Sequence, residues 1–285
     1  MSEFFTVLLQ YLLPKRLLNH LAGWFASRKG GAAMTASIAA FARRYRVDMS
    51  EAARPDLLAY ADFNDFFTRA LRPDARPLAG TDLVCPADGA ISECGAIAGE
   101  QIFQAKGHHY SAKALLGGDA GLAKKFENGS FATIYLSPRD YHRVHMPCAG
   151  RLVRMIHVPG SLFSVNPLMA RNIPGLFARN ERVVCVFESE QGSFALVLIG
   201  AVIVGSVATV WHGEVTPPHN RRASFWSYEG NDRIVELAQG EEMGRFRLGS
   251  TVVALFARQD MRFAPGWLPG KPVRMGEAMG SFEKC

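Results

Sequence analysis

Gly249 and Ser250 lie in the run Leu248–Thr251, which stands directly before a strongly apolar run, Val252–Phe256. The ordinary interpretation is a turn that leads into a buried strand, because Gly-Ser pairs are common in turns. A chemical interpretation is self-cleavage, in which the Ser250 hydroxyl attacks the carbonyl carbon of Gly249 and converts the peptide bond into an ester. Glycine leaves that carbonyl accessible and tolerates the bent backbone. Since a hydroxyl is a poor nucleophile until a base takes its proton, self-cleavage requires a histidine and a carboxylate that orients it.

Two other runs carry residues of these types. The segment 137–147 contains His142 and His145, and the run Pro86–Gly89 contains Asp88. Each run also has a plain interpretation as a turn, since Asp-Gly is a common turn pair, and two histidines can be metal ligands. We expect no metal, because no third or fourth ligand accompanies the histidines at a usable spacing. The sequence alone leaves open whether the runs meet in space.

The composition is typical of a globular chain that can bury a core. It has 285 residues, of which 48% are hydrophobic and 20% are charged. The formal net charge of +6 favours an anionic partner: nucleic acid, an anionic membrane or an acidic substrate. We expect no nucleic acid, because the sequence has no recognisable binding motif and its basic residues are spread along the chain. Five cysteines without a CxxC pair favour a reduced, cytosol-facing protein.

The elements that must position these residues begin with amphipathic helices. Apolar spacing predicts helices over 4–13 and 15–28, a third that Thr35 could cap, and a fourth over about 55–71. The second carries Trp24 in an apolar stripe flanked by basic residues, which is typical of an interfacial membrane anchor. A helical pair packed on the body of the protein or on a second subunit is equally compatible. No apolar stretch reaches the roughly 18–20 residues of a spanning helix, so we expect neither a membrane-spanning helix nor a secretory signal.

After about residue 72 the pattern changes to short β-branched runs separated by glycine and proline. We expect strands over 131–136, 151–158, 183–188, 194–199, 202–210 and 251–257. The sequence therefore predicts an α+β protein. It has a helical region over 1–62, for which membrane association is one of the two interpretations above, and a compact, mostly antiparallel β domain over 63–285 that contains the candidate catalytic residues. It contains no dinucleotide-binding glycine motif, P-loop or GxSxG elbow.

Taken together, the three runs resemble the signature segments of the phosphatidylserine decarboxylase family. LGST at 248–251 resembles the family's processing site, and PADG at 86–89 and YHRVHMP at 141–147 resemble its other two signatures. Further matching segments are 106–111, 160–167, 179–182, 202–207, Trp211 and 216–218. All occur in the family's order over about residues 64–280. The LGST form and the helical N-terminus resemble the longer bacterial type.

The resemblance implies a role for each matching residue. Asp88, His145 and Ser250 match the triad that drives self-cleavage between Gly249 and Ser250, giving fragments 1–249 and 250–285 that remain associated. Ser250 would become a pyruvoyl group, the cofactor, which forms a Schiff base with phosphatidylserine and accepts electrons as carbon dioxide leaves. His142 matches the residue assigned to decarboxylation and product protonation. Ser164 and Val165 match positions that line the substrate site.

The resemblance also implies a partner and a location. Phosphatidylserine lies in an anionic membrane, so we expect a peripheral protein on the cytoplasmic side of the cell membrane, with phosphatidylethanolamine as its product. The sequence leaves a homodimer open. The alternatives are a pyruvoyl decarboxylase of a soluble amino acid, a serine hydrolase that uses the same triad, and a non-catalytic membrane-bound module.

Overall fold

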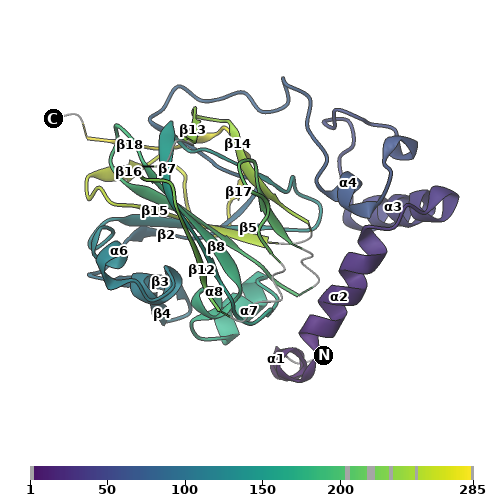
Figure 1. The fold of residues 1–285 in the computed structure, drawn as a ribbon, viewed down its shortest axis with the longest axis horizontal. Helices are drawn as coiled ribbons and strands as arrows, with labels where there is room; N and C mark the ends of the chain where they lie inside the picture. Colours follow the sequence, from purple (N-terminus) through teal and green to yellow (C-terminus); the bar gives the residue numbers. More distant parts are fainter. Residues whose placement is uncertain (1–2, 203–205, 217–221, 231–233, 248–249, 284–285) are drawn as a thin grey trace.

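The computed structural model describes residues 3–202, 206–216, 222–230, 234–247 and 250–283. A helical arm at the N-terminus, on which residues 57–67 pack, stands beside a β body that contains the sheets (Figure 1). The predicted α+β class, with mostly antiparallel sheets, is confirmed. None of the helices in the described ranges is long and apolar enough to cross a membrane.

Three helices form the arm: α1 (Glu3–Leu12), α2 (Lys15–Ala26) and α3 (Gly31–Tyr45). The first two agree closely with prediction. The expected cap at Thr35 is wrong, because α3 begins at Gly31 and the Thr35 hydroxyl donates to the Gly31 carbonyl inside the helix at 3.3 Å. Arg46, in the left-handed conformation with φ 56°, ends α3.

The predicted helix over 55–71 is also wrong. Two short elements take its place, η1 (Leu57–Ala59) and α4 (Phe63–Phe67). Asp56 and Asp62 have extended backbones, and their side chains accept hydrogen bonds from Leu58 N and Asp65 N, so each starts a new turn. The aromatic side chains of α4 then pack against α3, in a core separate from those of the sheet.

A large antiparallel sheet forms the centre of the body, with strand order β12-β7-β8-β9-β15-β5-β2-β17 and β13 paired to β7. Its strands are β2 (Gly89–Ala96), β5 (Ser130–Leu136), β7 (Gly150–Val158), β8 (Arg182–Glu188), β9 (Phe194–Ile199), β12 (Ser224–Ser227), β13 (Glu236–Leu237), β15 (Ser250–Phe256) and β17 (Pro272–Val273). Most of the predicted strands belong to this sheet, and each of these begins and ends within one residue of its predicted bounds. The strand expected over 202–210 is wrong in extent, because only Val207–Thr209 (β10) forms a strand among the residues described there.

Smaller elements cover the two faces of this sheet. One face packs on a four-stranded sheet of β6 (Arg143–His145), β10, β11 (Gly213–Glu214) and β14 (Glu242–Phe246), and on β1 (Leu83–Val84), β16 (Met261–Phe263) and β18 (Ala278–Phe282). The other packs on β3 (Gln101–Ala105), β4 (His108–Ser111), α5 (Ala112–Leu115), α6 (Ala120–Lys124), α7 (Pro167–Asn172) and α8 (Leu176–Arg179). The main sheet is therefore buried on both faces, which explains its continuous apolar runs.

Alternation along β15 fixes the direction of the serine at its start. Val252 and Ala254 belong to the core shared with β6 and β14, whereas Val253 and Leu255 belong to the opposite core. Because side chains alternate along a strand, Ser250 points into the first of these cores, which it shares with the four-stranded sheet that contains His145.

Candidate active site

Backbone hydrogen bonds bring the three signature runs to one region. His145 N donates to the Pro86 carbonyl at 2.8 Å, which joins the aspartate run to the histidine run. Phe246 N donates to the His142 carbonyl at 3.0 Å, so the strand that precedes the Gly-Ser pair lies against the same histidine run. The fold therefore brings close together three runs whose proximity the sequence alone left open.

Ser250 is fully buried, and its hydroxyl has no hydrogen-bond partner among the described residues. Leaving a buried polar group unpaired costs about 1–3 kcal/mol, so this is an unfavourable place for a serine that serves packing alone. Leu248 and Gly249, and with them the expected cleavage site, lie outside the described residues.

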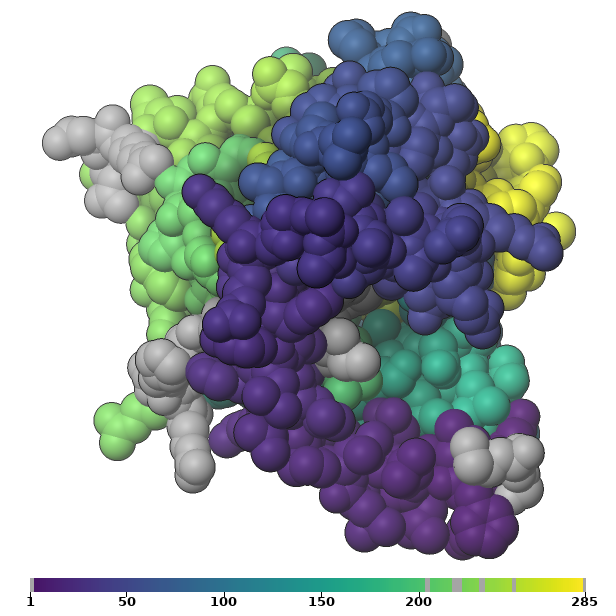
Figure 2. Space-filling model, turned by 90° about the vertical axis from the view of Figure 1, so that its right-hand side faces the viewer, coloured from purple at the N-terminus to yellow at the C-terminus, as the bar shows by residue number. Residues whose placement is uncertain are grey.

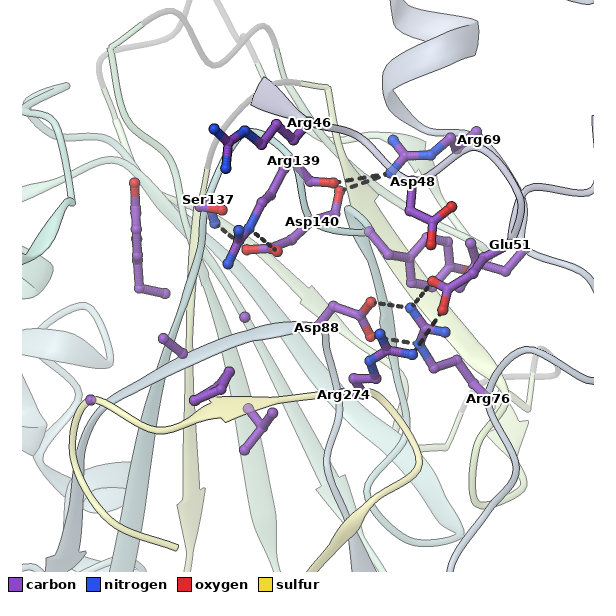
Figure 3. Close-up of a pocket in the computed structure, with 18 of the residues that line it drawn as sticks. Arg46, Asp48, Glu51, Arg69, Arg76, Asp88, Ser137, Arg139, Asp140 and Arg274 are labelled. Atoms are coloured by element: carbon purple, nitrogen blue, oxygen red, sulfur yellow. Dashed lines mark hydrogen bonds and ion pairs between the residues drawn. The ribbon is translucent and has the colours of Figure 1, made fainter. Parts of the chain in front are cut away.

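Asp88 is buried and accepts hydrogen bonds from Arg76 on both carboxylate oxygens, at 3.0 Å from Nε and 2.5 Å from Nη2. Met275 N also donates to its Oδ1 at 2.9 Å. Arg76 in turn binds Glu51 at 2.8 Å, and Figure 3 shows these side chains gathered with Arg274 on one wall of a cavity of about 640 Å³. Asp88 is therefore oriented by an arginine, not by a histidine.

His145 is held through both ring nitrogens. Its Nδ1 lies 2.8 Å from the Gly240 carbonyl and its Nε2 lies 3.0 Å from the Tyr141 hydroxyl. Since a carbonyl only accepts, Nδ1 carries the proton, and Nε2 accepts from the tyrosine. Burial lowers the pKa of His145, and the Gly240 carbonyl offsets part of this effect. The ring is thus a neutral base whose lone pair is engaged by Tyr141.

His142 has no exposed surface, and its ring stacks on Phe67 with the ring centroids 4.0 Å apart. Burial, followed by the positive charge of Arg69, lowers the pKa of His142 to about 3. The backbone of Ser137 and Pro138 partly opposes this shift, although neither ring nitrogen makes a hydrogen bond of good geometry within the described chain. His142 is therefore a neutral imidazole in an aromatic and apolar setting.

The predicted triad is gathered into one region without being hydrogen-bonded in series. The Asp88 carboxylate binds Arg76 and the His145 ring binds Tyr141, while the Ser250 hydroxyl has no hydrogen-bond partner among the described residues. Sequence reasoning did not single out Arg76 or Glu51. Tyr141 lies within the YHRVHMP signature, but its contact with His145 had no signal of its own.

The predicted substrate-lining residues lie where the helical arm meets the body. Ser164 N donates to Gln10 Oε1 of α1 at 3.0 Å, and Val165 is buried. Next to them, the Phe163 ring contacts Tyr11 with centroids 5.0 Å apart, and Lys15 Nζ lies 4.3 Å from its centre. The expected substrate site thus adjoins the helices expected to meet the membrane.

Comparison with known proteins identifies the family. The model of the family described as phosphatidylserine decarboxylase matches residues 63–281, and a second model, described as PSD, matches residues 5–46. The chain belongs to the phosphatidylserine decarboxylase family. It is 67% identical over 279 residues to the phosphatidylserine decarboxylase proenzyme of Methylibium petroleiphilum, which covers 98% of each chain. It is 61% identical over 283 residues to that of Polaromonas sp., covering 99% of this chain and 100% of the relative.

Membership of the phosphatidylserine decarboxylase family confirms the resemblance seen in the signature runs and makes the protein a carboxy-lyase. The relatives are named proenzymes, which is the designation of a chain that is processed before it acts. The family matches fall on the two parts of the fold, the arm and the β body.

Proposed function

We propose that the protein decarboxylates phosphatidylserine to phosphatidylethanolamine, using a pyruvoyl group that it makes from Ser250. The observation that carries the proposal is the buried, unpartnered hydroxyl of Ser250 beside the two-histidine run, in a chain whose relatives are named phosphatidylserine decarboxylase proenzymes. A serine in this position fits a precursor that is consumed once.

Self-cleavage is the first reaction of the proposal. The Ser250 hydroxyl loses its proton to a base and attacks the Gly249 carbonyl, so that the C–N bond breaks and an ester C–O bond forms. Elimination then removes the α-proton of residue 250 and expels the Gly249 carboxylate, leaving a dehydroalanine at the new N-terminus. Addition of water and loss of ammonia convert this end into a ketone.

His145 is the proposed base. Its Nε2 lone pair takes the Ser250 proton after the Tyr141 hydroxyl gives up that position. Asp88 is the proposed partner that stabilises the resulting imidazolium. Each carboxylate oxygen has two acceptor sites, and three of the four on Asp88 are occupied by Arg76 and Met275 N. One site on Oδ2 therefore remains for the Nδ1–H of His145, once that N–H leaves the Gly240 carbonyl.

Decarboxylation of an amino acid leaves an electron pair on carbon, and a pyruvoyl group supplies the electron sink that protein side chains lack. His142 is the residue that we assign to proton delivery at that carbon. Burial keeps the ring neutral before substrate binds. A substrate that carries a phosphate and a carboxylate into the site favours the protonated ring, because nearby negative charge raises the pKa of a histidine.

The arm is proposed to hold the enzyme on the membrane surface. Phe4 is 70% exposed and Trp24 is 55% exposed, and most of the other large apolar side chains of α1 and α2 are also exposed. Figure 2 shows the N-terminal residues spread across one face of the molecule. A peripheral position on the cytoplasmic side brings phosphatidylserine to Ser164 and Val165, which we assign to substrate binding because they meet the arm.

The intact mass of freshly purified protein under denaturing conditions tests the proposal. We expect two fragments, 1–249 and 250–285, with the smaller one carrying a ketone instead of an amine at its N-terminus. Carbon dioxide release from phosphatidylserine but not from free serine is expected of the same sample. A single uncleaved chain that releases no carbon dioxide from either compound overturns the proposal.

A further inference from the structure

A chain of ion pairs links Asp88 to distant parts of the sequence. Arg76 binds Asp88 and Glu51, and Glu51 also binds Arg274 at 2.8 Å. Glu51 follows the helical arm, whereas Arg274 and Met275 belong to the segment after β17. Figure 3 shows that the guanidinium of Arg76 lies between the two carboxylates of Asp88 and Glu51.

The geometry around Asp88 is that of a fixed acceptor. Two parallel hydrogen bonds from one guanidinium define the plane of a carboxylate, which a single ammonium cannot do. Met275 N adds a third hydrogen bond on Oδ1 and leaves only Oδ2 with an unused acceptor site. The carboxylate can therefore present that one site in a single direction.

Arg76 is itself held from its other side. Its Nη1 donates to the Ala75 carbonyl at 2.7 Å and its Nη2 is shared between Asp88 and Glu51. Burial alone would lower the pKa of the guanidinium, but the hydrogen bonds to Asp88 and Glu51 raise it above its usual value. The arginine thus stays charged, and its side chain has no freedom to turn away from Asp88.

We propose that Arg76, held from its other side by Glu51, is a positioning residue for self-cleavage: it fixes the Asp88 carboxylate so that its free Oδ2 site receives the Nδ1–H of His145 when that N–H leaves the Gly240 carbonyl. The inference rests on the proposed function, because it assigns Arg76 a role in a reaction that the proposal introduces. Arg76 touches neither the cleaved bond nor the nucleophile and acts through Asp88 alone.

Other titratable groups also interact with the Asp88 carboxylate, and a test of Arg76 must leave these groups unchanged. Besides Arg76, the titratable groups that interact electrostatically with Asp88 are Arg69, Cys85, Asp140, Tyr141 and His145. None of them is joined to Asp88 by a hydrogen bond or ion pair between described atoms. Replacing Arg76 therefore changes the orientation of the carboxylate and leaves its other charged neighbours in place.

The experiment measures the rate of self-cleavage of the full chain, expressed in a cell-free system and followed by denaturing gel. Arg76→Gln is expected to cleave roughly 10- to 100-fold more slowly than wild type, the effect of losing a hydrogen bond to a charged group. Arg76→Lys, which keeps the charge but not the two-point geometry, is expected to recover part of the rate.

Arg182→Gln is the matched control. Arg182 is also buried and donates three hydrogen bonds, but to the backbone carbonyls of Leu115, Asn180 and Ala114 instead of to a carboxylate. Its removal perturbs folding without touching Asp88, so its folded fraction should cleave at the wild-type rate. Equal rates for Arg76→Gln and Arg182→Gln, in a wild-type chain that does cleave, overturn the inference. Failure of the wild-type chain to cleave overturns the proposed function instead.

Discussion

Ser250 is paired with Leu136 across β15 and β5. Leu136 is the last residue of β5, and the chain continues from it through a short loop into His142 and β6. The first residue of one central strand thus lies opposite the last residue of its neighbour. This register places the proposed nucleophile beside the segment that carries both histidines, without any side-chain contact being needed to hold it there.

Replacing the proposed nucleophile or base should leave the protein as one chain. Ser250→Ala removes the attacking oxygen, so no cleavage is expected. His145→Ala removes the proton acceptor, and loss of a triad member costs about 10⁴-fold or more in comparable reactions. Intact mass spectrometry of the purified variants checks both. Ser37→Ala is the control and should cleave normally, because this half-buried serine of α3 donates its hydroxyl only to the Ala33 carbonyl of the same helix. Fragmentation of Ser250→Ala at 249/250 would contradict the assignment.

Polar substitutions on the arm should weaken membrane binding. Phe4→Glu and Trp24→Glu each remove an exposed aromatic side chain, worth about 1.5–3 kcal/mol when buried in an apolar phase. We expect each to reduce binding to anionic vesicles by about tenfold or more, measured by co-sedimentation. Activity on substrate dissolved in detergent should persist. Leu58→Glu is the control, since Leu58 is 74% exposed but lies outside the arm. An equal loss with Leu58→Glu would show that the effect is not specific to the arm.

The sequence predicts those features that depend on local pattern. The apolar run after Ser250 identifies β15, because a strand buried on both faces is apolar along its length. The spacing of Leu17, Leu21 and Trp24 identifies α2, because apolar side chains on one face of a helix recur with the helical period. The helix expected over 55–71 fails because capping by Asp56 and Asp62 outweighs the apolar spacing. The prediction that Thr35 caps α3 fails because a threonine can either cap a helix or donate to a carbonyl one turn earlier inside it, and nothing in the sequence distinguishes the two roles.

The site itself depends on contacts that the sequence does not encode locally. Asp88 and Met275 are 187 positions apart, yet share a hydrogen bond, and Arg76 and Glu51 share another across 25 positions. Family signatures identify Asp88, His145 and Ser250 as a set. They give no information about which hydrogen bonds each side chain makes before cleavage.

Acid should destabilise the folded protein through its buried histidine. The pKa of His142 is lowered from its ordinary value near 6.5 to about 3, so the unfolded chain binds more protons than the folded one between these values. The destabilisation caused by His142 is therefore absent well above pH 6.5 and grows as the pH falls toward 3. Between pH 7.5 and 5.5 we expect His142 to lower the free energy of unfolding by about 1.4 kcal/mol.

Urea unfolding at the two pH values measures this effect, in the Ser250→Ala background so that the chain is uncleaved. Adding His142→Gln should reduce the loss of stability between pH 7.5 and 5.5 by about that amount. His212→Gln is the control, because it makes the same replacement at an exposed histidine. If His142→Gln and its parent lose stability in parallel, His142 is not the buried neutral ring described above.

The two fragments should remain one folded body after cleavage, because the small fragment supplies the centre of the main sheet. β15 lies between β9 and β5 and pairs with both, and its residues from Ser250 to Phe256 are all buried. Arg274 and Met275 add contacts to Glu51 and Asp88 of the large fragment. Removing β15 would expose both cores at once.

We therefore expect the fragments to co-elute on size exclusion even at nanomolar concentration, and to separate only at the urea concentration that unfolds the sheet. Val253→Ala, which truncates a side chain at the centre of one core, should lower that concentration by an amount that reflects a loss of about 1–3 kcal/mol. Glu190→Ala, on the turn between β8 and β9, should leave it unchanged. Release of the small fragment by dilution alone, without unfolding, would show that β15 is not held as the register with its two neighbours requires.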